Sequence, residues 1–116
     1  MATVYLARDR RLGREVAVKV IHPHLRDSPE VVSRFSIEAK AVAKLRHPNI
    51  VDVYDVSEAG EAEQYLVVGL VRGETLRKLL SERGAMPAEV AAAVAMVLSS
   101  ALSHANGRGV VHRDVK

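Results

Sequence analysis

The segment from Glu15 to Ile21 constrains the fold of this chain more than any other stretch, because its side chains alternate in the manner of a β-strand. One face of this strand would hold Val16, Val18 and Val20, and the other would hold Ala17 and Lys19. A small side chain and a cation therefore point the same way, opposite the valines. Residues 4–8 also read as a strand and residues 10–14 as a turn, so the pattern predicts an antiparallel hairpin.

A long amphipathic helix is predicted over residues 29–46, with Ser28 as the cap and Pro29 at the first helical position. Its apolar face would consist of Val31, Phe35, Val42 and Leu45. Glu38 falls on that same face. A carboxylate within an apolar stripe is costly unless a cation meets it, so Glu38 should have a basic partner.

The rest of the chain predicts a second hairpin followed by two helices. The hairpin strands are residues 50–56 and 64–70, the first helix runs from Thr75 to Gly84, and the second from Pro87 to Asn106. The last helix is apolar on almost every side, which is typical of a helix buried from several directions. Little of the chain remains to cover it, so we expect a chain that is incomplete as a domain.

Composition excludes several classes of site and partner. Aromatic residues make up 3% of the 116 residues, so the core must be aliphatic. The net charge of +3 is scattered among acidic residues, which favours a solvated surface over nucleic-acid binding. The chain has no cysteine, which excludes disulfides and cysteine-based metal sites and is consistent with a cytoplasmic protein. His22 and His24 lack a third ligand, so we expect no metal site.

No membrane segment is expected in this chain. Its most apolar run, residues 90–102, is shorter than the roughly 20 residues that a spanning helix requires. The N-terminus also lacks the basic and apolar regions of a signal peptide. A full-length protein could still be anchored to a membrane elsewhere.

Several ordered motifs resemble those of one enzyme family. Val16-Ala17-Val18-Lys19 resembles the V-A-I-K strand, and His112-Arg113-Asp114 resembles the H-R-D catalytic loop. The connection Leu45-Arg46-His47-Pro48-Asn49 lies between them, as in the same family. The chain therefore resembles the N-terminal part of the catalytic domain of a bacterial, eukaryotic-like (Hanks-type) serine/threonine protein kinase.

This resemblance implies a set of ATP-binding residues. Lys19 would hold the α- and β-phosphates and pair with Glu38, while Val4 and Ala17 would pack on the adenine. Val68 would be the gatekeeper residue, and backbone groups near Gly69 and Val71 would bind the edge of the purine. At Gly69 the chain departs from the family, which usually has Glu there; a glycine adds flexibility to the connection.

The resemblance also implies two catalytic residues. Asp114 would orient the substrate hydroxyl and accept its proton. Lys116 would contact the transferred phosphate, and its position two residues after Asp114 is typical of serine/threonine rather than tyrosine kinases. Arg113 suggests control through a phosphorylated activation loop, because a guanidinium pairs well with phosphate.

The implied fold is a truncated protein-kinase-like fold of the α+β class, made of one partial domain, residues 1–116. Residues 1–70 would form the N-lobe, an antiparallel sheet without its first strand and with one packed helix. Residues 71–74 would form the hinge, and residues 75–116 the start of the C-lobe, with its first two helices and part of the catalytic loop. ATP and Mg²⁺ are the cofactors of the family, but its metal-binding Asn, five residues after Asp114, and the Asp of D-F-G are absent from these 116 residues.

Three functions compete on this basis. The first is ATP-dependent phosphorylation of Ser or Thr on protein substrates by the family's full catalytic domain, in a signalling role, with this fragment alone inactive. The second is a non-catalytic, pseudokinase-like binding or regulatory module, whose partner could be another kinase domain. The third is a basic globular domain of unrelated function, which the set of motifs disfavours.

Overall fold

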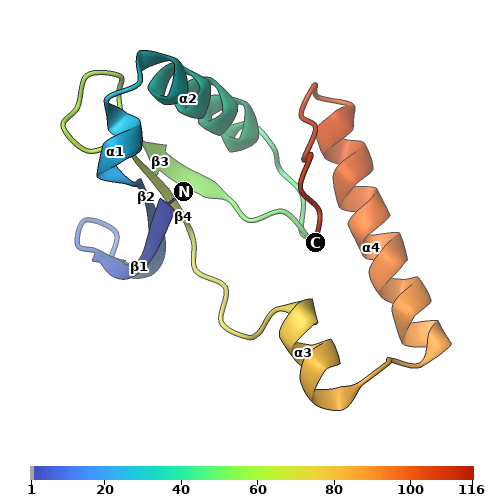
Figure 1. Ribbon diagram of the computed structural model, residues 1–116. Coiled ribbons are helices and arrows are strands. Elements are labelled where there is room, and N and C mark those ends of the chain that lie inside the picture. The colour runs from blue at the N-terminus through green and yellow to red at the C-terminus, as the bar shows by residue number, and fades with distance from the viewer. Residues whose placement is uncertain (1) are drawn as a thin grey trace.

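The computed structural model describes residues 2–116, which form an antiparallel sheet and four helices in two parts (Figure 1). The elements in order are β1 (Ala2–Asp9), β2 (Arg14–Ile21), α1 (Pro23–Arg26), α2 (Pro29–Ala43), β3 (Val53–Val56), β4 (Tyr65–Gly69), α3 (Leu76–Arg83) and α4 (Ala88–Asn106). The sheet lies with α1 and α2, and an extended connection leads from β4 to α3 and α4 (Figure 1). The predicted α+β class is confirmed.

The sheet has the strand order β1-β2-β4-β3, and all its neighbours are antiparallel. Both predicted hairpins are present. Strand β3 begins at Val53 rather than at residue 50, and its register shifts between Val53 and Asp55. A register shift of this kind bends the strand. The strand starts later than predicted because the chain turns before it, where the Ile50 N–H donates to the His47 carbonyl at 3.1 Å.

The helices differ from the predictions mainly at their ends. Pro29 opens α2 as expected, but the Ser28 side chain forms no capping hydrogen bond, and the helix ends at Ala43 rather than near residue 46. The sequence pattern does not predict the short helix α1, because His22-Pro23-His24 is equally typical of a plain loop. Pro23 is its first residue, a position where the fixed backbone angle of proline favours a helical turn.

The prediction that Glu38 lies within the buried stripe of α2 is wrong. The buried residues of this helix are Ser36 and Ala39, and Glu38 is exposed. At 3.6 residues per turn, Glu38 lies about 100° around the helix from Ala39. Phe35 is half-buried on the inner side. The helix thus turns its small side chains inward, which allows close packing and leaves Glu38 at the flank.

The buried apolar core is small and divided between the two parts of the chain. Its members are Val16, Ile21, Ala39, Leu45, Ala101 and Ala105. Helix α4 leaves much of its apolar surface exposed, including 73% of Met96. The expectation that the chain has little material to cover this helix is therefore confirmed.

Helix α4 is longer than the apolar run found in the sequence. With 19 residues it is long and apolar enough to cross a membrane, and 11% of its apolar stretch is buried. For a single helix, length and composition alone are weak evidence of a membrane span.

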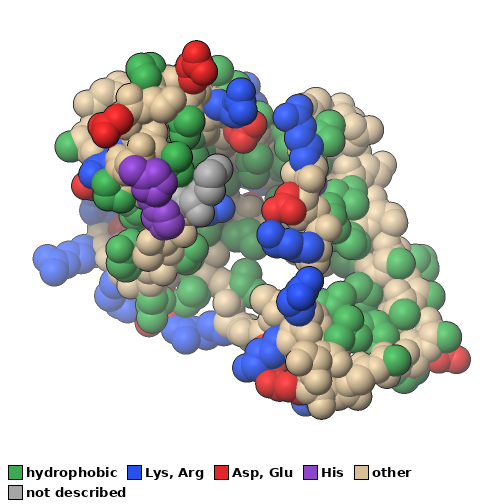
Figure 2. Space-filling model, in the orientation of Figure 1, with side chains coloured by type: hydrophobic (Ala, Val, Ile, Leu, Met, Phe, Trp, Pro, Cys, Tyr) green, Lys and Arg blue, Asp and Glu red, His purple; other side chains and the backbone are tan. Residues whose placement is uncertain are grey.

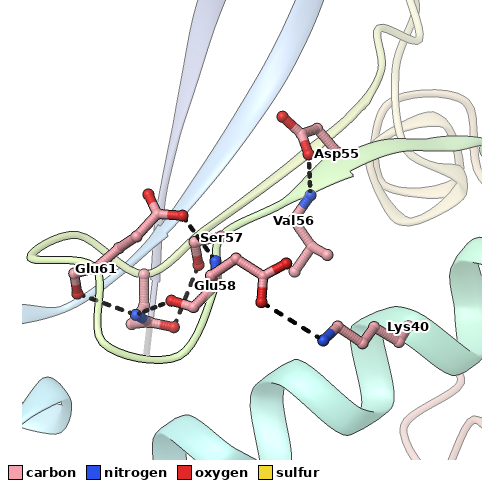
Figure 3. A network of polar contacts seen from close by, with 7 residues as sticks. Lys40, Asp55, Val56, Ser57, Glu58 and Glu61 are labelled. Carbon is pink, nitrogen blue, oxygen red and sulfur yellow. Dashed lines mark hydrogen bonds and ion pairs between the residues drawn. The ribbon is translucent and has the colours of Figure 1, made fainter.

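A buried polar pair closes the hairpin between β3 and β4 (Figure 3). Ser57 and Gln64 are 0% and 2% exposed. The Ser57 hydroxyl donates to Gln64 Oε1 at 3.2 Å and accepts from the Tyr65 N–H at 3.0 Å. Gln64 Nε2 in turn donates to the carbonyls of Glu58 and Glu61, both at 3.1 Å. These bonds satisfy buried groups that would otherwise destabilise the loop.

The same loop is tied to both helices beside the sheet. Arg26 of α1 donates to the Ala62 carbonyl at 2.7 Å and contacts the Glu63 carboxylate at 2.6 Å. Lys40 of α2 lies 3.9 Å from Glu58 (Figure 3). At the end of the loop, burial raises the pKa of the Tyr65 hydroxyl, with smaller contributions from the nearby carboxylates.

Substituting Ser57→Ala should destabilise the fold by about 1–3 kcal/mol, because it leaves Tyr65 N–H and Gln64 Oε1 without partners in a buried site. Urea unfolding followed by circular dichroism measures this change. The control Ser99→Ala changes an exposed serine of α4 and should alter the free energy of unfolding by less than about 0.5 kcal/mol. Equal effects of the two substitutions would contradict the role of the buried pair.

Candidate active site

One face of the sheet collects four of the predicted ATP-binding residues. Lys19 is paired with Val4 of β1 and Leu66 of β4, and Ala17 is paired with Leu6 and Val68. Paired residues in an antiparallel ladder point to the same face. This face, called the Lys19 face here, consists of Val4, Leu6, Ala17, Lys19, Leu66 and Val68. The register agrees with the prediction that Lys19 lies on the opposite face of the strand from Val16 and Val18.

The Lys19 face is open to solvent at β1. Val4 and Leu6 are 62% and 65% exposed, although both are large aliphatic side chains, and Lys19 is exposed. An apolar surface of this kind with a cation beside it can accept a flat apolar group that carries negative charge. The charge on Lys19 would attract the anion, and the aliphatic side chains would cover the apolar part.

In the connection after β4, the backbone groups that a ligand could reach are those of Val71. The Gly69 N–H is not one of them. The Gly69 N–H already donates to the Asp52 carbonyl at 2.9 Å. Val71 is 70% exposed, and within residues 2–116 its backbone takes part in none of the hydrogen bonds found outside helices and strands. Its N–H and C=O are therefore available to a ligand.

Side chains on the opposite face of the sheet explain the glycine at position 69. A Cβ placed on Gly69 would lie 3.3 Å from the Tyr54 hydroxyl, which is closer than nearly all such contacts. The Arg14 guanidinium stacks on the Tyr54 ring, 3.6 Å from its centroid. On the Lys19 face itself, Glu15 forms an ion pair with Arg72 of the connection. The sequence motifs did not indicate this cluster, because its contacts join segments far apart in the chain.

Lys19 and Glu38 do not form the expected ion pair. Both side chains are exposed, and no contact of 4.0 Å or less joins their charged atoms among the described residues. The physical reason is the rotation of α2 described above, which turns Ser36 and Ala39 toward the sheet.

The last residues of the chain form a compact polar turn. The Asp114 N–H donates to Nδ1 of His112 at 3.2 Å, and Lys116 Nζ lies 3.1 Å from Asp114 Oδ2. Both charged side chains are more than 70% exposed. Arg113 has a φ of 66°, a left-handed conformation that non-glycine residues seldom adopt. Asp114 and Lys116 are therefore brought together, with solvent in front of them.

The turn at the end of α4 directs this segment back toward the sheet. Gly109 adopts a φ of 79°, and the Val110 N–H donates to the Ala105 carbonyl at 3.0 Å. In Figure 1 the C-terminal segment runs along the side of α4 that faces the sheet. Figure 2 shows Lys and Arg side chains, with an acidic side chain among them, at the edge of the opening between the two parts. This distribution of charge favours an anionic ligand.

Comparison with known proteins identifies the family. The sequence profile of the protein kinase domain matches residues 1–116. The chain belongs to the protein kinase family. Its predicted membership and its predicted kinase-like fold are both confirmed.

Two curated relatives of this kinase sequence are bacterial serine/threonine kinases. It is 42% identical to a probable serine/threonine-protein kinase of Clostridium perfringens, over 100% of this chain and 17% of that protein. It is 43% identical to serine/threonine-protein kinase PknL of Mycobacterium tuberculosis, over 99% of this chain and 29% of that protein. The chain thus spans less than a third of the length of either relative.

Solved structures support the same assignment. The kinase domain of Mycobacterium tuberculosis PknI is 29% identical and superposes with a TM-score of 0.86, over 100% of this chain and 47% of that chain. The kinase sequence therefore has the fold of about half of a kinase domain. The division at residues 70 and 74 into N-lobe, hinge and C-lobe stays a prediction, as do the roles of the individual site residues.

Gly109 should be needed for the turn that follows α4, whereas Gly107 should not. Gly109→Ala forces an L-residue into a left-handed conformation, so we expect destabilisation of about 1 kcal/mol. Gly107 has a helical φ of −61°, and an added Cβ meets only ordinary contacts, so Gly107→Ala should be neutral or stabilising. Thermal unfolding of the two variants compares them directly. A larger loss with Gly107→Ala would contradict the role assigned to Gly109.

Proposed function

We propose that the protein containing these residues transfers the γ-phosphate of ATP to Ser or Thr hydroxyls of protein substrates. The observation that supports this most strongly is the register of β2, which gathers Val4, Ala17, Lys19 and Val68 on one face. Adenine would lie on the aliphatic part of the Lys19 face, with its edge toward the backbone of Val71. Lys19 would contact the α- and β-phosphates.

Asp114 is the candidate base, and Lys116 the candidate phosphate contact. In the proposed reaction the substrate hydroxyl oxygen forms a bond to the γ-phosphorus, and the bond between that phosphorus and the β–γ bridging oxygen breaks. The hydroxyl proton passes to the Asp114 carboxylate. Lys116, 3.1 Å from this carboxylate, is close enough for its charge to stabilise the phosphoryl oxygens beside it.

The two metal ligands that the resemblance implies, the Asn five residues after Asp114 and the Asp of D-F-G, are not among these 116 residues. Within residues 2–116 no group of three or more His, Cys, Asp or Glu side chains lies close enough together to hold a metal ion. In the family the metal neutralises phosphate charge, and the ligands implied by the resemblance lie outside this sequence. For that reason we propose that the 116-residue chain by itself binds ATP weakly and does not transfer phosphate.

Lys19→Met should weaken ATP binding by the 116-residue chain by roughly 10- to 100-fold, since a hydrogen bond to a charged group is worth about 1.5–3 kcal/mol. Isothermal titration with ATP measures the dissociation constant. Lys44→Met is a matched control, because Lys44 is exposed at the end of α2 and away from the Lys19 face. Equal losses in both variants would indicate non-specific attraction of the nucleotide.

A phosphoryl-transfer assay with radiolabelled Mg²⁺-ATP should detect no turnover by the 116-residue chain, because two metal ligands of the family are missing. In a longer protein that contains them, Asp114→Asn should lower the rate by about 10²- to 10⁴-fold. Turnover by the 116-residue chain that Asp114→Asn abolishes would refute the proposed inactivity.

One observation favours the alternative of a non-catalytic binding module. Glu38 is exposed and does not contact Lys19 within 4.0 Å, so this arrangement lacks an ion pair that the family uses in catalysis. Under this alternative the chain would bind another kinase domain and would not transfer phosphate. Retained ATP binding together with inactivity of a longer protein would favour it over the first proposal.

A further inference from the structure

One hydrogen bond joins α4 to the sheet-bearing part of the molecule. It runs between His47, in the connection from α2 to β3, and the Ser100 hydroxyl of α4, over 3.1 Å. Within residues 2–116, no other hydrogen bond or ion pair links residues 2–70 with residues 75–116. Among the described residues, this contact is therefore the polar link between the two parts, beside the apolar packing of Ala101 and Ala105.

The protonation of His47 follows from its two partners. Its Nδ1 accepts a hydrogen bond from the Asn49 N–H at 3.0 Å, and a backbone N–H can only donate. In the neutral ring Nε2 must then hold the proton and donate it to Ser100. The hydrogen bond from Asn49 thus requires a neutral His47, whereas the contact with Ser100 requires only that Nε2 carries a proton.

His104 of α4 lies against His47 and also favours the neutral form. The ring centroids are 5.2 Å apart and tilted by 52°. His104 Nε2 is buried without a hydrogen-bond partner. Burial lowers the pKa of His104, and the positive charges of Arg108 and of a protonated His47 lower it further.

Among the described residues, no carboxylate lies within ion-pair distance of either ring, since no Asp or Glu oxygen is within 4.0 Å of a His47 or His104 nitrogen. The charged neighbours on the connection are Arg46 and Asp52, which lie 4.0 Å from one another. On α4 the charged neighbour is Arg108, whose guanidinium donates to the His104 carbonyl.

We propose that His47, Ser100 and His104 form an acid-sensitive joint that holds α4 against the connection between α2 and β3. A proton added to His47 Nδ1 would face the Asn49 N–H and break that hydrogen bond. A proton added to His104 would place a charge on a buried nitrogen beside Arg108. The first change releases the His47 ring from the backbone of the connection, and the second favours separation of α4 from the connection.

The direction of the pH dependence follows from the closed joint being neutral. Once the joint opens, His104 is exposed to water and its pKa returns toward the ordinary value of about 6.5. The open state therefore binds more protons than the closed state as the pH falls below about 6.5. The joint should be fully formed above that pH and lost progressively below it. This inference does not depend on the proposed function.

The absence of cysteine allows a direct distance measurement. Ile37→Cys on α2 and Met96→Cys on α4 replace side chains that are 66% and 73% exposed, and both can carry spin labels. We expect the distance distribution between the labels to be narrow at pH 8 and to widen as the pH falls toward 5. His104→Gln should remove most of this response, because it removes the buried titrating ring.

A second histidine pair provides the matched control. His22 and His24 also lie close together, with ring centroids 5.7 Å apart, but they are far from α4 in the sequence and do not contact it. The double variant with His22→Gln and His24→Gln should keep the full pH response. The proposed joint would be refuted if this control lost the pH-dependent widening, or if His104→Gln kept it.

The unaltered chain provides a test that does not depend on how the variants fold. Nuclear magnetic resonance of the histidine rings gives the titration midpoint of His104. We expect this midpoint to lie below pH 6.5. It should coincide with the pH at which the label distance distribution widens in the chain that carries only the two labels. A midpoint at or above 6.5, or a label distance that is constant from pH 8 to 5, would show that no such joint exists.

Discussion

Strand β2 is the element on which both the fold and the candidate site depend. It is paired on both sides, so its register determines which residues of β1 and β4 lie beside Lys19. A slip of one residue would bury Lys19 and expose Val16, which is 3% exposed in the observed register. Burying an unpaired cation is costly, so the same alternation that stabilises the sheet also keeps Lys19 at an accessible surface.

Local pattern was sufficient to predict the elements that form the Lys19 face. The alternation in β2 and the turn before it specify a hairpin, and Thr75 does cap α3 by accepting from the Lys78 N–H as expected. The orientation of α2 could not be predicted in this way. Periodicity identifies residues that share a face, but Ser36 and Ala39 are too small or polar to stand out as the buried side.

Contacts between segments that are far apart in the chain also could not be predicted from the sequence. Nothing near Gly69 indicates that Tyr54 occupies the space in front of it, or that Arg14 stacks on the same ring. The motifs placed Asp114 and Lys116 near one another because only two positions separate them. The position of this pair relative to Lys19 is set by α4 and by the connection after β4, whose conformations no local pattern specifies.

The two parts of the molecule are stabilised unequally, and this bears on the site between them. The sheet part has its own strand ladder and the buried Ser57–Gln64 pair, whereas α4 leaves 73% of Met96 exposed. Lys19 belongs to the first part and Asp114 to the second. The distance between Lys19 and Asp114 is therefore set mainly by the segments that join the two parts. Because one hydrogen bond at His47 supplements the covalent connection, small changes there would alter the site without disturbing the sheet.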